Sequence, residues 1–344
     1  MKLQKIQEPV KNLLEETDTF LEKALESNID IVNEIIDISP IAKGKKIRST
    51  LLFLLAGLDN NISPDLPRLA ASIEMLHLSS LIHDDVVDHS ERRRGEETVN
   101  VNFGNFISVL WGDFLFINSI DNFSKVEKKY TDIIIKAARA MVEGQMLEVE
   151  NTANFDIRLN IYYDIVKKKT SSLFAGVAEI ASVLNGAPTE AQKAYYDFGL
   201  DFGTMFQVSD DVLDIFSENS GKDRFRDLKE GKITLPVILL LKENKQALKE
   251  NFPGVKRPKN AAGAGREKLR GYYSLFFSLK DKILTDRNIE RILGLFKDNH
   301  IEQLSRQKVK EYYDRCTAFL DGYPPSVYKE SLSGLLDFVK NRDY

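Results

Sequence analysis

Two aspartate-rich stretches, each within an apolar helical pattern, constrain this chain more than any other feature. The first covers residues 77–88, where apolar side chains recur at helical spacing and no glycine or proline interrupts the pattern. The helical repeat places four polar side chains on one stripe, with a fifth at its border. The stripe consists of His77, Ser80, Asp84 and Asp88, with Asp85 beside it.

A second stripe lies within residues 203–214 and consists of Gln207, Asp210, Asp211 and Asp214. One such cluster is usually a solvated helix face, but two copies in apolar helices favour a buried site. Neighbouring carboxylates repel each other by up to ~4 kcal/mol at an effective dielectric constant of ~20, and Mg²⁺ removes that repulsion because it prefers oxygen ligands. We therefore expect two helices that face each other across a cavity, with metal ions and an anion between them.

Four basic segments lie close to polar or aspartate-rich helices in the sequence and suit the binding of an anion. They are Lys43–Arg48, Glu91–Gly95, Lys167–Thr170 and Gly221–Lys232. Arginine binds phosphate oxygens with two parallel hydrogen bonds, and a glycine-containing turn before a helix adds backbone N–H donors. Each segment alone could also be a solvated charged turn, or contain lysines that reach the surface. Because one basic segment follows each aspartate cluster, the sequence favours two halves of one anion and metal site.

The rest of the chain predicts a single helical domain over residues 1–344, without a strand. The one linker-like stretch, at about 251–266, is typical of a flexible surface loop. A net charge of −4 gives no sign of nucleic-acid binding, and the single cysteine, Cys316, excludes a disulfide framework. The longest apolar runs are too short for a transmembrane segment and the N-terminus lacks a signal-peptide pattern, so we expect a soluble, cytoplasmic protein.

With these motifs the chain resembles the trans-isoprenyl (polyprenyl) diphosphate synthases, in particular the long-chain polyprenyl synthetases, over nearly its whole length. The shared motifs, in the family's order, are Gly44–Arg48, His77–Asp88, Arg93–Gly95, Lys169–Thr170, and Phe206–Asp214 followed by Gly231–Lys232. The resemblance implies an all-α fold, an orthogonal helical bundle around a deep central cavity, and a homodimer. It also implies a Mg²⁺-dependent prenyltransferase, in which Mn²⁺ can substitute. Such an enzyme condenses isopentenyl diphosphate with an allylic diphosphate into an all-trans polyprenyl diphosphate.

The resemblance further implies a role for each matching residue. Mg²⁺ on the allylic diphosphate would be held by the catalytic residues Asp84, Asp85, Asp88, Asp210, Asp211 and Asp214. The same diphosphate would be bound by Arg93, Lys169, Gln207 and Lys232, of which the two lysines are also catalytic, and Thr170 and Lys222 would contribute to substrate binding. The diphosphate of isopentenyl diphosphate would be bound by Lys45, Arg48, His77 and Arg94.

Two segments depart from the family's pattern. The family usually has Arg-Pro after the basic turn, and this chain has Arg48-Ser49. After Lys222, the usual Pro-x-Gly-x-Asp is replaced by Asp223–Asp227, so Phe225 stands where the family has glycine. Since phenylalanine does not reach glycine's dihedral angles freely, we expect the loop that closes over the substrate to differ here.

The expected chemistry needs positive charge rather than a side-chain nucleophile. Metal ions, lysines and arginines neutralise the leaving diphosphate, and the double bond of isopentenyl diphosphate attacks the resulting allylic cation. A His-Asp metal phosphohydrolase is an alternative suggested by His83-Asp84, but the chain has only four histidines and that reading leaves the second cluster unexplained. A non-catalytic regulatory subunit would typically lose aspartates, and a terpene cyclase would not need a second diphosphate site.

Product length is predicted from two small residues before the first aspartate cluster. Short-chain relatives commonly have an aromatic residue at the position of Ser79, and here both Ser79 and Ser80 are small. We therefore expect an open cavity at this level and a medium-to-long product, with a geranylgeranyl or farnesyl diphosphate synthase as the alternative. The serines could instead serve only close helix packing.

Overall fold

A computed structural model describes residues 2–38, 44–59, 61–93, 95–217, 224–243 and 286–342. Arg94, Lys222 and the expected surface loop at about 251–266 lie outside the described residues, so their assignments stay predictions. The described residues are helical almost throughout, which confirms the all-α fold class. The described elements are α1 (Leu3–Gln7), η1 (Glu8–Val10), α2 (Lys11–Leu25), α3 (Asp30–Ile38), α4 (Ile47–Gly57), α5 (Leu66–Val87), β1 (Arg92–Arg93), β2 (Glu96–Glu97), α6 (Val99–Ser124), α7 (Lys128–Glu150), α8 (Leu159–Val166), η3 (Lys167–Ser171), α9 (Ser172–Leu184), α10 (Thr189–Phe216), α11 (Arg226–Lys229), α12 (Leu235–Glu243), α15 (Asp286–Asp298), α16 (Ile301–Asp321) and α17 (Val327–Lys340).

The chain divides into two compact units, which are described separately. Unit 1 comprises Met1–Ala138, Gly176–Tyr196 and Tyr323–Leu335, and unit 2 comprises Arg139–Ala175, Asp197–Gly322 and Leu336–Tyr344. Four of the boundaries fall inside α7, α9, α10 and α17, and the fifth lies between α16 and α17. The first aspartate cluster belongs to unit 1 and the second to unit 2.

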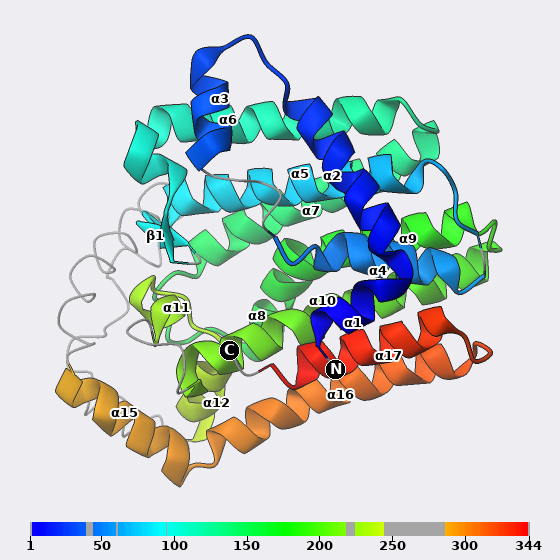
Figure 1. Ribbon diagram of the computed structural model, residues 1–344. Helices are drawn as coiled ribbons and strands as arrows, with labels where there is room; N and C mark the ends of the chain where they lie inside the picture. Colours follow the sequence, from blue (N-terminus) through cyan, green and yellow to red (C-terminus); the bar gives the residue numbers. More distant parts are fainter. Residues whose placement is uncertain are drawn as a thin grey trace. The chain divides into compact units, whose positions relative to one another are not determined.

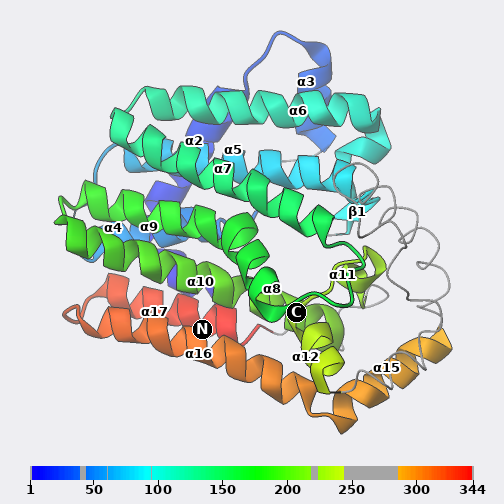
Figure 2. The ribbon, with the colours of Figure 1, turned by 180° about the vertical axis from the view of Figure 1, so that it is seen from behind.

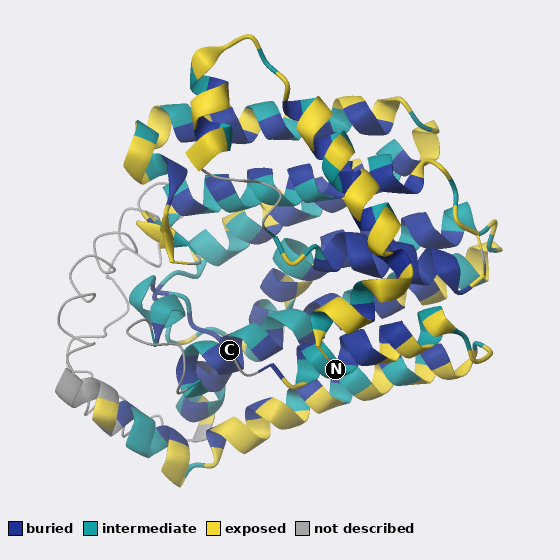
Figure 3. Cartoon of the chain, viewed as in Figure 1, coloured by how far each residue is buried: buried dark blue, intermediate teal, exposed yellow. Residues whose placement is uncertain are grey.

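Unit 1 is organised around α5, which packs against α2, α4 and α6. Figure 1 shows α5 and α6 side by side, with α2 crossing over α5. Every residue of α4 is buried, and α4 is dark along its whole length in Figure 3. The α5–α6 contact is close because Gly112 lacks a side chain: a Cβ there would lie 2.3 Å from His83 Nε2. The glycine therefore allows the helix that bears the first aspartate cluster to pack tightly on α6.

Helix α6 has an apolar outer face. In the part of the chain that the structure describes, it alone is long and apolar enough to cross a membrane by length and composition, a test that core helices of soluble proteins also pass. Our expectation concerned uninterrupted apolar runs, and this helix is interrupted by polar residues such as Asn105 and Asp113. Trp111 and Leu115 of α6 lie in the core of unit 1, whereas Phe106 and Ile117 are 76% and 63% exposed.

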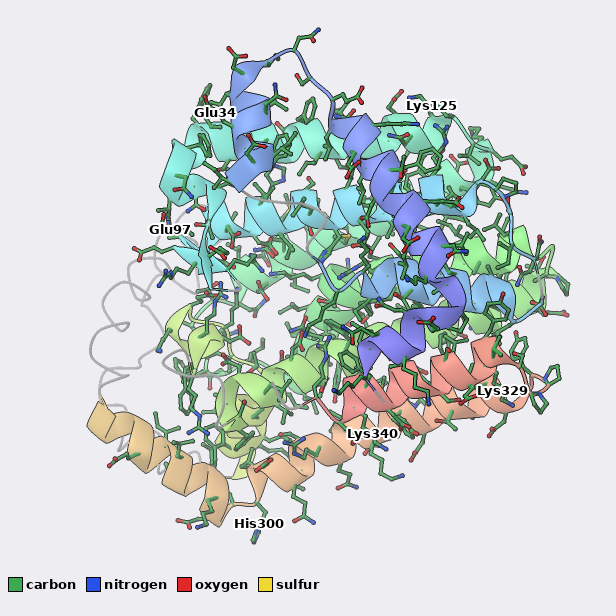
Figure 4. All side chains as sticks on the ribbon, in the orientation of Figure 1. Glu34, Glu97, Lys125, His300, Lys329 and Lys340 are labelled. Atoms are coloured by element: carbon green, nitrogen blue, oxygen red, sulfur yellow. The ribbon has the colours of Figure 1, made fainter. Side chains whose placement is uncertain are left out.

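Unit 2 contains the C-terminal part of α10, with α8, η3, α12, α15 and α16. Helix α16 packs against α12 and α15, as seen from behind in Figure 2. His300, labelled in Figure 4, lies at the turn between α15 and α16 and has a left-handed backbone, with φ of 53°. Between α8 and α9 the helix widens into a π-helical turn, Lys167–Ser171, a local distortion that is frequent at functional sites.

Candidate active site

The first aspartate cluster lies at the C-terminal end of α5, as the helical spacing predicts. Asp85 is buried, and Arg93 binds its carboxylate with two guanidinium nitrogens: Nε lies 3.0 and 2.9 Å from the two oxygens and Nη2 lies 2.7 Å from Oδ1. Asp84 and Asp88 are partly exposed on the neighbouring stripe. Asp85 therefore orients Arg93, and it differs in its surroundings from the other two aspartates.

Arg93 is positioned by a short hairpin that contradicts our expectation of a chain without strands. Arg92 and Arg93 pair with Glu97 and Glu96 in an antiparallel register. Gly95 at the turn has φ of 88°, a left-handed value that glycine adopts without strain. Figure 4 labels Glu97, on the second strand of this hairpin. The turn brings the guanidinium of Arg93 back onto α5.

The expected isopentenyl diphosphate residues Lys45, Arg48 and His77 all belong to unit 1. Lys45 and Arg48 flank the start of α4, and His77 lies on α5, against which α4 packs. Gln7 donates to the backbone oxygen of Lys45 at 3.0 Å, and Lys46 forms an ion pair with Asp18. The basic turn is thus held to the N-terminal helices by specific polar contacts.

The second aspartate cluster lies on α10 in unit 2, and its members have distinct partners. Asp211 is buried and accepts hydrogen bonds from the hydroxyl of Tyr162, at 2.5 Å, and from Gln207 Nε2, at 2.9 Å. The oxygen of the Gln207 amide in turn accepts from Thr170 Oγ1 at 2.8 Å. Asp210 forms an ion pair with Arg342. Thr170 and Gln207, which the sequence assigned to substrate binding, are thereby joined to Asp211.

Asp214 is held by the backbone at the start of α11. Its Oδ1 accepts from the N–H of Arg226 at 2.9 Å and its Oδ2 from the N–H of Asp227 at 3.3 Å. The preceding residue, Phe225, has φ of 62° and ψ of 29°. Phe225 therefore does adopt a glycine-like conformation, at a cost of about 1–2 kcal/mol for an L-residue. Burial of its ring, which is 0% exposed, offsets that cost with about 1.5–3 kcal/mol.

One pocket in unit 2 brings together residues that lie far apart in the sequence. Its polar lining consists of Glu148, Asn151, Tyr162, Lys169, Thr170, Gln207, Asp211, Asp227, Lys232 and Thr234. Lys169 Nζ lies 2.6 Å from a carboxylate oxygen of Glu148, and Lys232 Nζ lies 2.7 Å from one of Glu230. Gly144 permits this arrangement, because a Cβ there would lie 2.4 Å from the backbone nitrogen of Lys169.

The charges of this pocket shift the pKa values of its acids in opposite directions. Burial raises the pKa of Glu148, but Lys169 and Lys232 outweigh it and hold that pKa below its usual value. Burial and the charge of Asp227 raise the pKa of Asp211 and of Asp214 to about 8. Burial also raises the pKa of Asp227 to about 6, against the opposing charge of Lys232. Burial and mutual repulsion thus disfavour the charged forms of Asp211, Asp214 and Asp227.

A divalent cation fits this donor set. The carboxylates are oxygen ligands, which Mg²⁺ prefers, and their mutual repulsion would be relieved by a cation. Within the described ranges, no group of three or more His, Cys, Asp or Glu side chains is close enough to hold a metal ion alone. The expected metal role of the aspartates therefore stays a prediction.

Sequence reasoning missed five residues that contact the expected site residues: Glu148, Tyr162, Asp227, Glu230 and Arg342. Glu148 lies in the last turn of α7, and Tyr162 lies on α8, before the Lys169 motif. A tyrosine or glutamate within an apolar helical pattern needs a polar partner when it is buried, and this could have marked both residues as contacts of the site. The partner itself, at a separation of 49 residues for Tyr162 and Asp211, has no signature in a single sequence.

Comparisons with known proteins agree with this geometry. A model of the polyprenyl synthetase family matches residues 29–264. The octaprenyl diphosphate synthase of Escherichia coli (strain K12) is 30% identical over 352 residues, covering 100% of this chain and 100% of that protein. The geranylgeranyl diphosphate synthase of Methanosarcina mazei is 37% identical over 206 residues, covering 57% of this chain and 63% of that protein. A solved polyprenyl synthase from Caulobacter crescentus CB15, complexed with calcium and isoprenyl diphosphate, has a TM-score of 0.86 at 25% identity, covering 100% of this chain and 98% of that one.

Proposed function

The chain belongs to the polyprenyl synthetase family, and we propose that it is a trans-prenyltransferase that joins isopentenyl diphosphate to an allylic diphosphate. The observation that carries the proposal is the pocket of unit 2. There Lys169, Thr170, Gln207 and Lys232, from three separate segments, surround the buried Asp211. Two lysines beside buried carboxylates suit a diphosphate bound together with a cation.

The residues of this pocket would act on the leaving group. Lys169 and Lys232 exchange their Glu148 and Glu230 partners for diphosphate oxygens, and Gln207, oriented by Thr170, donates alongside them. The two aspartate clusters would hold Mg²⁺, for which Mn²⁺ can substitute, and this cation would neutralise charge that develops on the diphosphate. Asp84 and Asp88 are suited to that task, since both lie partly exposed on one stripe of α5.

The reaction then balances without a side-chain base. The allylic C–O bond breaks and its electron pair stays on the diphosphate. The double bond of isopentenyl diphosphate attacks the allylic cation, and a new C–C bond forms. A proton leaves the resulting cation for the released pyrophosphate. Lys45, Arg48 and His77 would bind the diphosphate of isopentenyl diphosphate, with Arg94 and Lys222 as further predicted contacts.

We propose a medium-to-long all-trans product. The supporting relative is the octaprenyl diphosphate synthase, which aligns over the whole chain, whereas the geranylgeranyl diphosphate synthase aligns over 57% of it. A geranylgeranyl product remains the second candidate, because that shorter alignment has the higher identity, 37% against 30%.

We also propose that the enzyme is a cytoplasmic homodimer whose interface covers α6. The outer face of this helix presents Phe106, Leu110 and Ile117 at helical spacing, and all three are exposed in the single chain. An exposed apolar stripe of this kind marks a protein interface. Light scattering after size-exclusion chromatography should give a dimer, and Leu110→Glu should shift it to monomer.

One assay tests the central proposal. Purified protein is incubated with labelled isopentenyl diphosphate, Mg²⁺ and geranyl, farnesyl or geranylgeranyl diphosphate in turn, and the products are separated by chain length. Incorporation of label that requires an allylic starter and is abolished by EDTA is expected. Hydrolysis of phosphoesters without chain elongation would support a metal phosphohydrolase instead.

A further inference from the structure

Phe225 has a combination of backbone and side-chain surroundings that the family's glycine at this position would not have. Its backbone is left-handed, with φ of 62°, and its side chain is completely buried. The ring is stacked at 6.3 Å on Phe296 of α15, and Phe216 at the end of α10 contacts Phe296 edge-on at 5.5 Å. The ring thus packs the segment after the second aspartate cluster onto α15, which the end of α10 also contacts through Phe296.

The backbone on both sides of this ring is bonded to Asp214. The N–H of Phe225 donates to the backbone oxygen of Asp214 at 3.0 Å. The next two N–H groups, of Arg226 and Asp227, donate to the two carboxylate oxygens of Asp214. The orientation of that carboxylate therefore depends on where these three successive residues lie.

We propose that Phe225 is a positioning residue for the second aspartate cluster. Its ring anchors the start of α11, and the anchored N–H groups fix the carboxylate of Asp214. A glycine would allow the same dihedral angles but supply no anchor, and the backbone would then have more freedom to leave Asp214. The inference rests on the proposed function, in which Asp214 helps to hold the cation.

Two substitutions separate the ring from the backbone conformation. Phe225→Gly keeps the left-handed backbone and removes the ring, whereas Phe225→Leu keeps an apolar anchor on a strained backbone. Binding of Mn²⁺ alone is followed by electron paramagnetic resonance, and protection of the Arg226 and Asp227 amides by hydrogen exchange. We expect the glycine variant to bind Mn²⁺ about tenfold more weakly, as loss of a residue that orients a ligand typically does. Both amides should lose protection, and the leucine variant should stay near wild type.

The controls distinguish positioning from general destabilisation. Phe123→Ala removes an equally buried ring from α6 in unit 1 and should lower thermal stability without changing Mn²⁺ binding. If the glycine variant does not fold, Phe296→Ala removes the partner ring without leaving a large apolar side chain, and should weaken Mn²⁺ binding in its place. Wild-type Mn²⁺ affinity and amide protection in whichever of the two variants folds would overturn the proposal. Failure of wild-type protein to elongate an allylic substrate would instead refute the proposed function, while the amide comparison would still decide the role of the ring.

Discussion

Ser49 donates two hydrogen bonds to one oxygen of Glu74: its backbone N–H lies 3.1 Å and its hydroxyl 2.7 Å from Oε1. Ser49 is fully buried in the first turn of α4, directly after Arg48, and Glu74 lies one turn before His77 on α5. Proline, which the family usually has at this position, lacks both donors. This chain therefore ties the start of α4 to α5 by a contact that the usual residue cannot make.

We expect Glu74→Ala to weaken the binding of isopentenyl diphosphate selectively. The change leaves two donors of Ser49 without their acceptor, at a cost of about 1–3 kcal/mol, and loosens the turn beside Arg48. The KM for isopentenyl diphosphate should rise severalfold while the KM for the allylic substrate stays unchanged. Lys45→Ala should show the same pattern and Arg93→Ala the reverse. An equal rise of both constants in Glu74→Ala would contradict this assignment.

Local regularity explains what could be predicted from the sequence. Helical spacing alone placed Asp84 and Asp88 on one stripe of α5, because that spacing depends only on neighbouring residues. The hairpin at Arg92–Arg93 was missed because two-residue strands are too short to show an alternating pattern. The partners of the site residues were missed for a different reason. Arg342 and Asp210 are 132 residues apart, and only the tertiary fold brings them together.

The ion pair between the buried Arg342 and the partly exposed Asp210 gives a second prediction. The guanidinium also lies 4.0 Å from the centre of the Phe206 ring, and its side chain is 4% exposed. Arg342→Met should lower the free energy of unfolding by about 1–3 kcal/mol, because Asp210 loses its ion pair. In an Asp210→Asn background the same change should cost less, which a double-mutant cycle in urea would reveal. Lys340→Met, which removes a more exposed cation over Tyr313, is the matched control. If the losses of unfolding free energy in the two single variants simply added in the double variant, Arg342 and Asp210 would not stabilise the fold through their interaction.

The two aspartate clusters should both be required for turnover, but not every aspartate for the same reason. Asp84→Ala and Asp210→Ala should lower kcat by orders of magnitude with an unchanged circular dichroism spectrum. Asp85→Asn should mainly raise the KM for the allylic substrate, because its partner Arg93 loses a charged, two-point contact. Activity is measured at increasing Mg²⁺ concentrations, which separates the loss of a cation ligand from the loss of the Arg93 contact. Near-normal activity of either alanine variant would refute the two-cluster site.

Stability of the metal-free protein should depend on pH through the buried acids of unit 2. Their pKa values are raised, to about 6 for Asp227 and about 8 for Asp211 and Asp214, mainly by burial. An acid whose pKa is raised by folding stabilises the protein below its unfolded pKa, and that contribution is lost as pH rises through the folded value. These three groups should therefore reduce stability progressively from about pH 4 to above pH 8.

Asp227→Asn tests this dependence directly. The substitution removes one charge and the repulsion that Asp227 exerts on Asp211 and Asp214. Relative to wild type, the variant should gain more stability at pH 8 than at pH 5 in urea unfolding with EDTA. Mg²⁺ should stabilise wild type most at the higher pH. If the free energy of unfolding changed with pH equally in the two proteins, the charge of Asp227 would not destabilise the folded state.

Product length can be tested at two adjacent serines that the structure places differently. Ser79 is buried, and its hydroxyl donates to the backbone oxygen of Gly112 at 2.8 Å, so it lies in the α5–α6 contact. This is the packing role that the sequence left open for it. Ser80 is only partly buried, lies one turn before Asp84 on the aspartate stripe, and donates to the backbone oxygen of His77 at 2.7 Å.

A phenylalanine should therefore act differently at each position. Ser80→Phe should shorten the product, because it adds a ring on the stripe from which the growing tail must leave the diphosphate. Ser79→Phe has no space beside Gly112 and should cost about 1–3 kcal/mol of stability by overpacking, with any shortening secondary to that. Ser119→Phe is the control, since Ser119 is equally buried and donates to Ser72 in the same helix pair at 2.7 Å, away from the aspartates. Product chain length, measured by chromatography, and the thermal unfolding temperature are compared among the three variants. An unchanged product distribution in an active Ser80→Phe variant would show that the tail does not pass this stripe.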